Sequence, residues 1–89
     1  MEASEKILYQ EDSCKLTPRE IEYLSLVALG YRNWMIAKKL FVSTSTVKKT
    51  LENIFYKLEA KDRANAVAIA FARGILTNYI VTKTNGKYN

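Results

Sequence analysis

The stretch that decides the fold runs from residue 33 to residue 58 and reads NWMIAKKLFVSTSTVKKTLENIFYKL. Two runs of apolar residues recur in it every three to four positions, which is typical of amphipathic helices. They are Ile36, Ala37 and Leu40, and then Val47, Leu51, Ile54 and Leu58. Ser43 is placed to cap the second run with its hydroxyl. The stretch therefore predicts a short helix, a tight turn and a longer helix that share one core.

The side of the longer helix opposite its apolar stripe carries hydroxyls, ammonium groups and a carboxylate. Its residues are Thr44, Ser45, Lys48, Lys49, Glu52 and Tyr56. A helix that enters the DNA major groove needs such groups, because phosphates accept from hydroxyls and amines and base edges require longer donors and acceptors. The alternative is an ordinary solvated helix face, which any small helical domain has.

The distribution of charge favours a nucleic acid. Residues 31–58 hold six basic side chains against Glu52 alone, so this span carries a net +5, equal to the net charge of the whole chain. The remaining spans nearly cancel one another. Charge alone does not distinguish DNA from an anionic membrane surface, but charge concentrated on a helix-turn-helix predicts a DNA partner.

The 89 residues, 48% of them apolar, suffice for one small domain. We expect a flexible lead-in over 1–15, an all-α domain over 16–76 and a tail over 77–89. Thr17-Pro18-Arg19-Glu20 predicts a helix start with a capping box and proline at the first position, and Gly30 its end. The apolar stripe of this first helix is Ile21, Leu24, Val27 and Ala28. The tail has a β-prone run over 79–82 and a turn signal at Asn85-Gly86, but no partner strand, so we expect disorder.

A last helix is predicted over 63–73, capped by Asp62 and stopped by Gly74. Ala66, Val67, Ala70 and Phe71 are expected to face the core. The other side is also apolar, which favours self-association through a dimer interface of Asn65, Ala68, Ile69 and Ala72. The alternative is an alanine-rich helix that only has high helix propensity.

Several classes of function are disfavoured. The chain has no histidine and one cysteine, Cys14, so we expect no metal, no cofactor and no disulfide within the chain. No paired catalytic carboxylates, phosphate-binding glycine loop or activated nucleophile is recognisable, so we expect no enzyme and no small-molecule ligand. With neither a spanning segment nor a signal peptide, the prediction is a cytoplasmic protein without a membrane partner.

The segment from Leu16 to about Leu76 resembles the LuxR-type (GerE-type) DNA-binding domain of bacterial transcription regulators. The matching motifs are Leu16-Thr17-x-Arg19-Glu20-x-Glu22, Gly30, Asn33-x-x-Ile36-Ala37-x-x-Leu40, Ser43-x-x-Thr46-Val47-Lys48, Asn53-Ile54, Lys57-Leu58 and Arg63-x-x-Ala66-Val67. The resemblance implies four helices, the third in the major groove and the fourth commonly forming the dimer contact.

Position by position, the resemblance and the helix faces together assign the DNA contacts. Expected base contacts are Lys48, Lys49, Glu52 and Ser45. Expected phosphate contacts are Arg32, Lys38, Lys39, Ser43, Thr44 and Thr46. Glu59 departs from the family, because it stands where a glycine usually ends the recognition helix and where positive φ is favoured.

Trp34 is a second departure, and two interpretations stay open. Its indole packs against Tyr31 or the N-terminal segment, or it is an exposed contact for a partner. The main hypothesis is a sequence-specific, dimeric transcription regulator, with RNA polymerase or another regulator as a further candidate partner. The alternative is a protein-interaction module that keeps the fold but has lost specific DNA binding.

Overall fold

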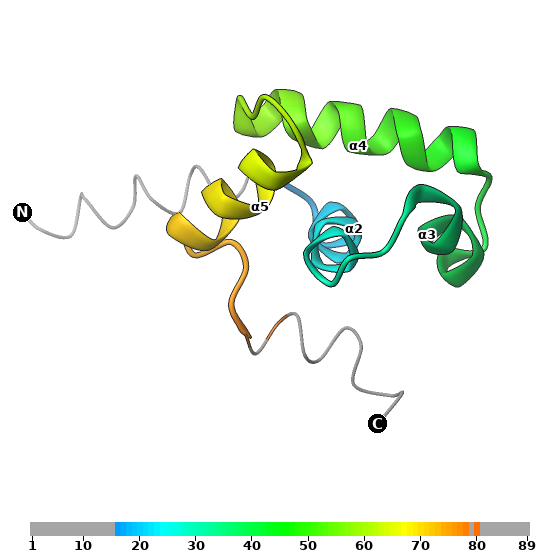
Figure 1. The fold of residues 1–89 in the computed structure, drawn as a ribbon, viewed down its shortest axis with the longest axis horizontal. Helices are drawn as coiled ribbons and strands as arrows, with labels where there is room; N and C mark the ends of the chain where they lie inside the picture. The colour runs from blue at the N-terminus through cyan, green and yellow to red at the C-terminus, as the bar shows by residue number, and fades with distance from the viewer. Residues whose placement is uncertain (1–15, 79, 81–89) are drawn as a thin grey trace, which may run out of the picture.

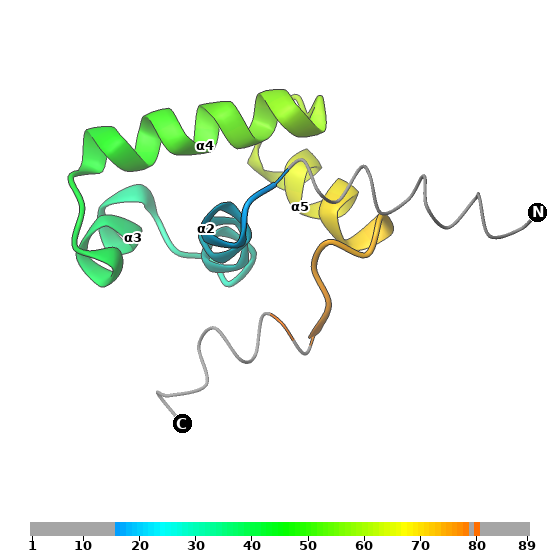
Figure 2. The ribbon, with the colours of Figure 1, turned by 180° about the vertical axis from the view of Figure 1, so that it is seen from behind.

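The computed structural model describes residues 16–78 and residue 80, and this part of the chain forms four helices and no strand. The helices are α2 (Pro18–Ala28), α3 (Asn33–Leu40), α4 (Thr44–Leu58) and α5 (Arg63–Ala72). Figure 1 shows α4 lying across the other three, with α3 under its N-terminal end and α5 under its C-terminal end. The view from behind in Figure 2 shows the same order, with α2 between them. The predicted all-α, four-helix fold is confirmed.

Three predicted helix starts are present with the expected caps. The Thr17 side chain accepts from the amide of Glu20 at 3.1 Å, and the Glu20 carboxylate accepts from the amide of Thr17 at 2.9 Å, so the capping box is complete. Ser43 accepts from the amide of Thr46 at 3.0 Å, and Asp62 from the amide of Asn65 at 2.8 Å. Each cap satisfies an amide that has no partner within its own helix.

The core lies where the four helices meet. The two apolar runs of the deciding stretch are buried as predicted, and Ile36, Val47 and Ile54 are completely inaccessible to solvent. The stripe predicted for α2 faces the core: Leu24 and Val27 are buried, and Ile21 and Ala28 are half-buried and pack against it. Tyr23 and Leu26, which were not predicted, are buried as well. The reason is that α2 packs against both α4 and α5, so more than one of its sides faces the core.

The last helix also differs from the prediction. Ala66 and Ala70 are buried, but Phe71 is 39% exposed and does not enter the core. Ile69, expected on the outer side, is half-buried and packs against the core. Beyond Gly74, Ile75 and Leu76 are buried and belong to the core, which was not predicted.

Both helices of the helix-turn-helix end in the left-handed conformation without a glycine. The φ angle is +59° at Phe41, after α3, and +59° at Glu59, after α4. The positive φ expected at Glu59 is therefore confirmed, while Phe41 was not expected to adopt it. A residue with a Cβ costs about 1 kcal/mol in this conformation.

Part of the chain lies outside the described residues. The 1–15 lead-in with Cys14, and the turn at Asn85-Gly86, belong to it. Of the β-prone run over 79–82 only Ile80 is described, and it is helical rather than disordered, with its amide donating to the Thr77 hydroxyl at 3.1 Å. Among the described residues, no helix combines the length and apolarity needed to cross a membrane.

Candidate nucleic-acid interface

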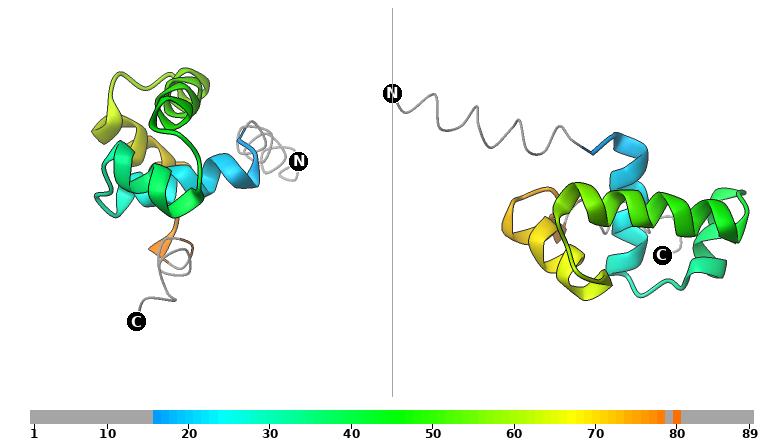
Figure 3. Two further views of the ribbon diagram at one scale, coloured as in Figure 1. Left: turned by 90° about the vertical axis from the view of Figure 1, so that its right-hand side faces the viewer. Right: turned by 90° about the horizontal axis from the view of Figure 1, so that it is seen from above.

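The outer face of α4 is a line of exposed side chains on a firmly packed helix. Ser45, Lys49, Glu52 and Tyr56 follow one another at intervals of three or four residues and are all exposed, Tyr56 to 81%. The opposite side of α4 is held in the core by its four buried apolar residues. The view from above in Figure 3 shows α4 in front of the other helices along its whole length. The face predicted to read DNA is therefore accessible, on a helix whose opposite side packs in the core.

Three hydroxyls are arranged around the first turn of α4. The Ser43 hydroxyl donates to the Thr46 hydroxyl at 2.9 Å and lies 3.1 Å from the Ser45 hydroxyl. Because the Ser43 proton is used for Thr46, the Ser45 hydroxyl is the donor in the second contact. Thr46 is the acceptor in the first contact. Together with the amides of the first helical turn, this places several donors at the positive end of the helix dipole, which favours an anion.

The structure separates the predicted phosphate contacts into two groups. Arg32 and Thr44 line the same open hollow, of about 440 Å³, beside the start of α4. Lys38 and Lys39 lie elsewhere, lining a second hollow on α3 with Trp34, Met35 and Phe41. Arg32 and Lys38 are exposed, and Lys39 is half-buried. The hydroxyls and Arg32 thus gather at one end of α4, whereas the two lysines of α3 belong to a different surface.

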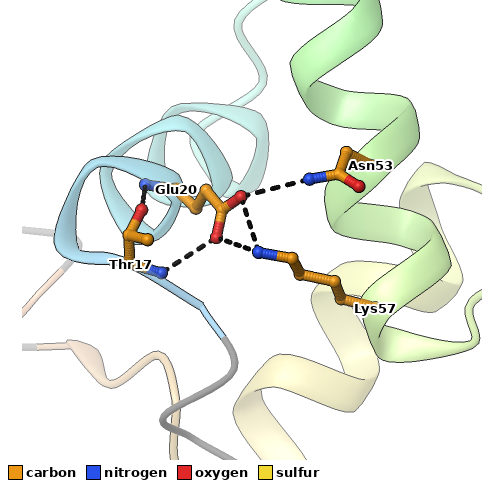
Figure 4. A network of polar contacts seen from close by, with 4 residues as sticks. All are labelled: Thr17, Glu20, Asn53 and Lys57. Carbon is orange, nitrogen blue, oxygen red and sulfur yellow. Dashed lines mark hydrogen bonds and ion pairs between the residues drawn. The ribbon is translucent and has the colours of Figure 1, made fainter.

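Lys57 has a structural partner. Its ammonium lies 3.0 Å from both carboxylate oxygens of Glu20, and Asn53 donates to the same carboxylate at 3.4 Å, which ties α2 to α4 (Figure 4). Burial opposes the charged form of Glu20, but the Thr17 amide and Lys57 together outweigh it and hold the pKa of this carboxyl below its ordinary value of 4.5. One of the six positive charges counted for residues 31–58, that of Lys57, is therefore paired with Glu20 of α2.

A second tie was not recognised in the sequence. The Arg63 guanidinium donates to the Asn33 side chain and to the carbonyl of Tyr31, each at 2.9 Å. It joins the start of α5 to the start of α3 across thirty residues of sequence. Both Arg63 and Asn33 belong to the motifs of the resemblance, and this was the only signal for them; spacing alone gives no reason to pair them.

The predicted dimer residues of α5 do not all share one environment. Ala68 and Ala72 are exposed, and Ala64 and Phe71 lie on the same face. Asn65 is half-buried, and its side-chain oxygen accepts from the Lys61 amide at 2.9 Å, so it helps to close the turn before α5. The exposed face of α5 is therefore formed by three alanines and Phe71, with Ile69 turned partly toward the core.

Trp34 is 58% exposed, and the N-terminal segment, one of its two predicted packing partners, lies outside the described residues. It lies between the two hollows and contributes to the lining of each. Tyr31 lines one of them with it, yet more than half of the indole remains in solvent. Within the described residues, no group of three or more potential ligands of the kind that holds a metal ion is found.

Comparisons with known proteins agree with this geometry. The family model of the bacterial regulatory proteins of the luxR family matches residues 14–70. The chain is 50% identical over 60 residues to YxjL of Bacillus subtilis (strain 168), an uncharacterized transcriptional regulatory protein, and 44% identical over 61 residues to the response regulator protein VraR of Staphylococcus aureus (strain Mu3 / ATCC 700698). These matches cover 67% and 68% of the chain but only 28% and 29% of the two relatives, so the chain corresponds to less than a third of their length. The family is regulatory rather than catalytic, and the helix-turn-helix formed by α3 and α4 lies wholly within the matched residues. The chain belongs to the luxR family of bacterial regulatory proteins.

Proposed function

We propose that the chain is a sequence-specific transcription regulator that binds double-stranded DNA with α4 in the major groove. The observation that carries the proposal is the outer face of α4. Its exposed side chains have no packing role, while the inner face of the same helix is buried to the last turn. A helix that presents hydroxyl, ammonium and carboxylate groups outward meets the requirements of groove recognition.

The outer face of α4 is long enough for its two ends to make different contacts with DNA. Ser45 and Tyr56 are eleven residues apart, about 16 Å along the helix axis. The N-terminal half of α4, which carries the hydroxyls and both lysines, is the part proposed to enter the groove. Lys48, Lys49, Glu52 and Ser45 are proposed to contact bases, with Glu52 accepting from a cytosine amino group. Tyr56, at the other end of this face, is proposed to lie within reach of a phosphate.

Phosphate contacts are proposed for the hydroxyls at the start of α4 and for the basic residues beside it. The hydroxyls of Ser43, Thr44 and Thr46 lie at the first turn of α4, Arg32 shares a hollow with Thr44, and the first-turn amides add further donors. Lys38 and Lys39 would contribute from α3. Such contacts fix the position of the protein on the duplex without reading its sequence.

We also propose that two copies bind together through the exposed face of α5. Three alanines there allow close approach of a second helix, and Phe71 supplies an exposed apolar side chain. A two-fold dimer would place two copies of α4 in successive major grooves, with half-sites about 10 base pairs apart. Such a regulator acts where the bacterial DNA is, in the cytoplasm, with RNA polymerase or another regulator as its further partner.

The experiment that tests the DNA proposal is fluorescence anisotropy on random duplex and on a pool selected for binding, over a series of salt concentrations. The wild-type protein should bind the selected pool more tightly, with an affinity that falls steeply with salt. Lys48→Ala/Lys49→Ala should lose this advantage, whereas Lys61→Ala, a control outside the proposed interface, should keep it. Equal binding of all three proteins to both DNAs would contradict groove recognition.

The dimer is tested separately. Ala68→Glu places a charge on the exposed face of α5 without disturbing Ile69, which packs against the core. Sedimentation of the wild-type protein should show a concentration-dependent dimer that this variant lacks. A monomer at all concentrations in both proteins would contradict the α5 interface but would leave the DNA proposal standing.

A further inference from the structure

The outer side of α3 carries Lys38 and Lys39, which are proposed above to contact phosphates, but also apolar side chains that DNA binding does not explain. Ile36, Ala37 and Leu40 hold the inner side of this helix in the core. The opposite side, which we call the α3 surface, consists of Trp34, Met35, Lys38, Lys39 and Phe41, and these five residues line an open hollow of about 440 Å³. We propose that the α3 surface is a docking site for an acidic segment of a partner protein that inserts one large apolar side chain.

The two aromatic rings of the α3 surface are strongly exposed. Trp34 is 58% and Phe41 is 93% accessible to solvent. Trp34 and Lys38 are four residues apart and lie on one side of α3. Phe41 follows the helix directly and lines the same hollow. Contiguous exposed apolar side chains on a small protein mark a contact for another molecule, because leaving them in water is unfavourable.

The backbone at Phe41 supports the same conclusion independently. Its φ angle of +59° lies in the left-handed region, where glycine or asparagine is preferred. With 93% of its surface in solvent, the phenyl ring contributes almost nothing to the core. Neither backbone preference nor packing therefore accounts for a phenylalanine at this position. A contact between its ring and another molecule would account for it.

Charge complementarity identifies the occupant. The exposed ammonium of Lys38 lines the hollow, the described lining residues include no carboxylate, and no residue of α3 is acidic. An acidic segment matches this potential, and its apolar side chain would pack between the two aromatic rings. A duplex fits less well, because phosphates and base edges gain from donors and acceptors, whereas Trp34 and Phe41 offer mainly apolar ring surface. The site is only two helical turns long, so the contact would be a small and transient one.

The test uses Trp34, the one tryptophan of the chain, as its probe. The full chain is titrated with 12-residue peptides that carry one leucine among four aspartates or glutamates, free of tryptophan. Binding should shift the emission of Trp34 to shorter wavelength and saturate. Peptides with asparagine and glutamine in place of the acids, or alanine in place of leucine, should bind at least tenfold more weakly.

Phe41→Gly separates docking from folding. Glycine adopts the left-handed conformation without strain and has no side chain to accommodate. The variant should therefore be at least as stable as the wild type. It should nevertheless bind the acidic peptides at least tenfold more weakly. Its affinity for duplex DNA should be unchanged, which distinguishes failure of this inference from failure of the proposed DNA function.

Three outcomes would overturn the inference. An emission shift produced by duplex DNA but not by the peptides, with DNA affinity weakened by Phe41→Gly, would assign the surface to DNA. A shift that grows with protein concentration alone, together with faster sedimentation, would assign it to a second copy of the chain. No saturable response to any peptide, with wild-type and Phe41→Gly proteins both folded, would show that acidic segments do not dock there.

Discussion

The two helices of the helix-turn-helix are alike on their inner faces and different on their outer faces. Both α3 and α4 bury an aliphatic stripe, and Ile36 and Ile54 are each completely inaccessible. Outward, α4 presents hydroxyls, lysines and a glutamate, whereas α3 presents two aromatic rings, a methionine and two lysines. The inner faces decide how the helices pack, and the outer faces decide what each helix can bind. One small motif thereby gains two surfaces of different chemistry.

The largest expected effect tests whether the inner faces are equivalent. Ile36→Ala and Ile54→Ala each remove a fully buried side chain, so each should lower the free energy of unfolding by about 2–5 kcal/mol. Urea denaturation followed by circular dichroism measures the loss. Lys49→Ala, on the exposed face of α4, serves as control and should stay within about 0.5 kcal/mol of wild type. If one of the two variants lost much of its free energy of unfolding and the other lost none, only one of the two helices would depend on the core.

The next effect tests the division of labour between the two outer faces on DNA. Lys49→Ala should weaken the free energy of binding to the preferred sequence by about 1–3 kcal/mol, because it removes a base contact. Its effect on binding to random duplex should be small. Lys38→Ala should weaken both duplexes alike and reduce the salt dependence by about one phosphate contact. Anisotropy titrations on the two DNAs measure both quantities. If each variant lost the same affinity for selected and for random DNA, α4 would not be reading bases.

A smaller effect concerns the polar tie that fastens α4 to α2. The pKa of Glu20 is lowered in the folded protein, so its carboxylate stabilises the fold above about pH 4.5, its ordinary value. That stabilisation is lost as the pH falls through the folded pKa. Glu20→Gln should therefore lower stability by about 1 kcal/mol at pH 7 and by less in acid, since the wild type has then lost the same contribution.

Unfolding by urea at pH 7 and at successively lower pH checks this prediction. Glu22→Gln is a suitable control, because its contact with Arg19, at 3.2 Å, joins two partly exposed side chains of one helix. The control should follow the wild-type pH profile. If Glu20→Gln followed that profile too, the Lys57 contact would contribute nothing to stability.

Periodicity and caps allowed much of the fold to be predicted, because both depend on neighbours in the sequence. The starts at Thr17, Ser43 and Asp62 and the buried stripes of α3 and α4 are of this kind. The errors in α5 have another origin. Ile75 and Leu76 lie beyond the helix and are buried, which the local pattern of the helix does not reveal.

In the candidate site, too, the features that depend on local spacing could be predicted, and those that depend on distant residues could not. The outward direction of Ser45, Lys49 and Glu52 follows from helix geometry, and the structure exposes all three. Contacts between distant residues could not be predicted. The pairing of Lys57 with Glu20 and that of Arg63 with Asn33 each join different helices, which no local spacing reveals. The α3 surface was predicted only in part. Trp34 was a candidate partner contact, whereas the exposed ring of Phe41, in the left-handed turn after the helix, was not expected.

The smallest expected effect compares the two helix ends. Phe41 and Glu59 both adopt a φ of +59°, so Phe41→Gly and Glu59→Gly should each relieve strain. Glycine also gives the unfolded chain more freedom, which offsets part of the gain, so we expect about 0.5–1 kcal/mol of stabilisation at each site. Because the two turns lie at opposite ends of α4, the gains should add in the double variant. Thermal and urea unfolding measure them, with Lys61→Gly, in a turn without positive φ, as the matched control that should not gain. A loss of stability for Phe41→Gly alone would mean that its ring contributes to the fold after all, and would remove the distinction between the packed inner face of α3 and its outer surface.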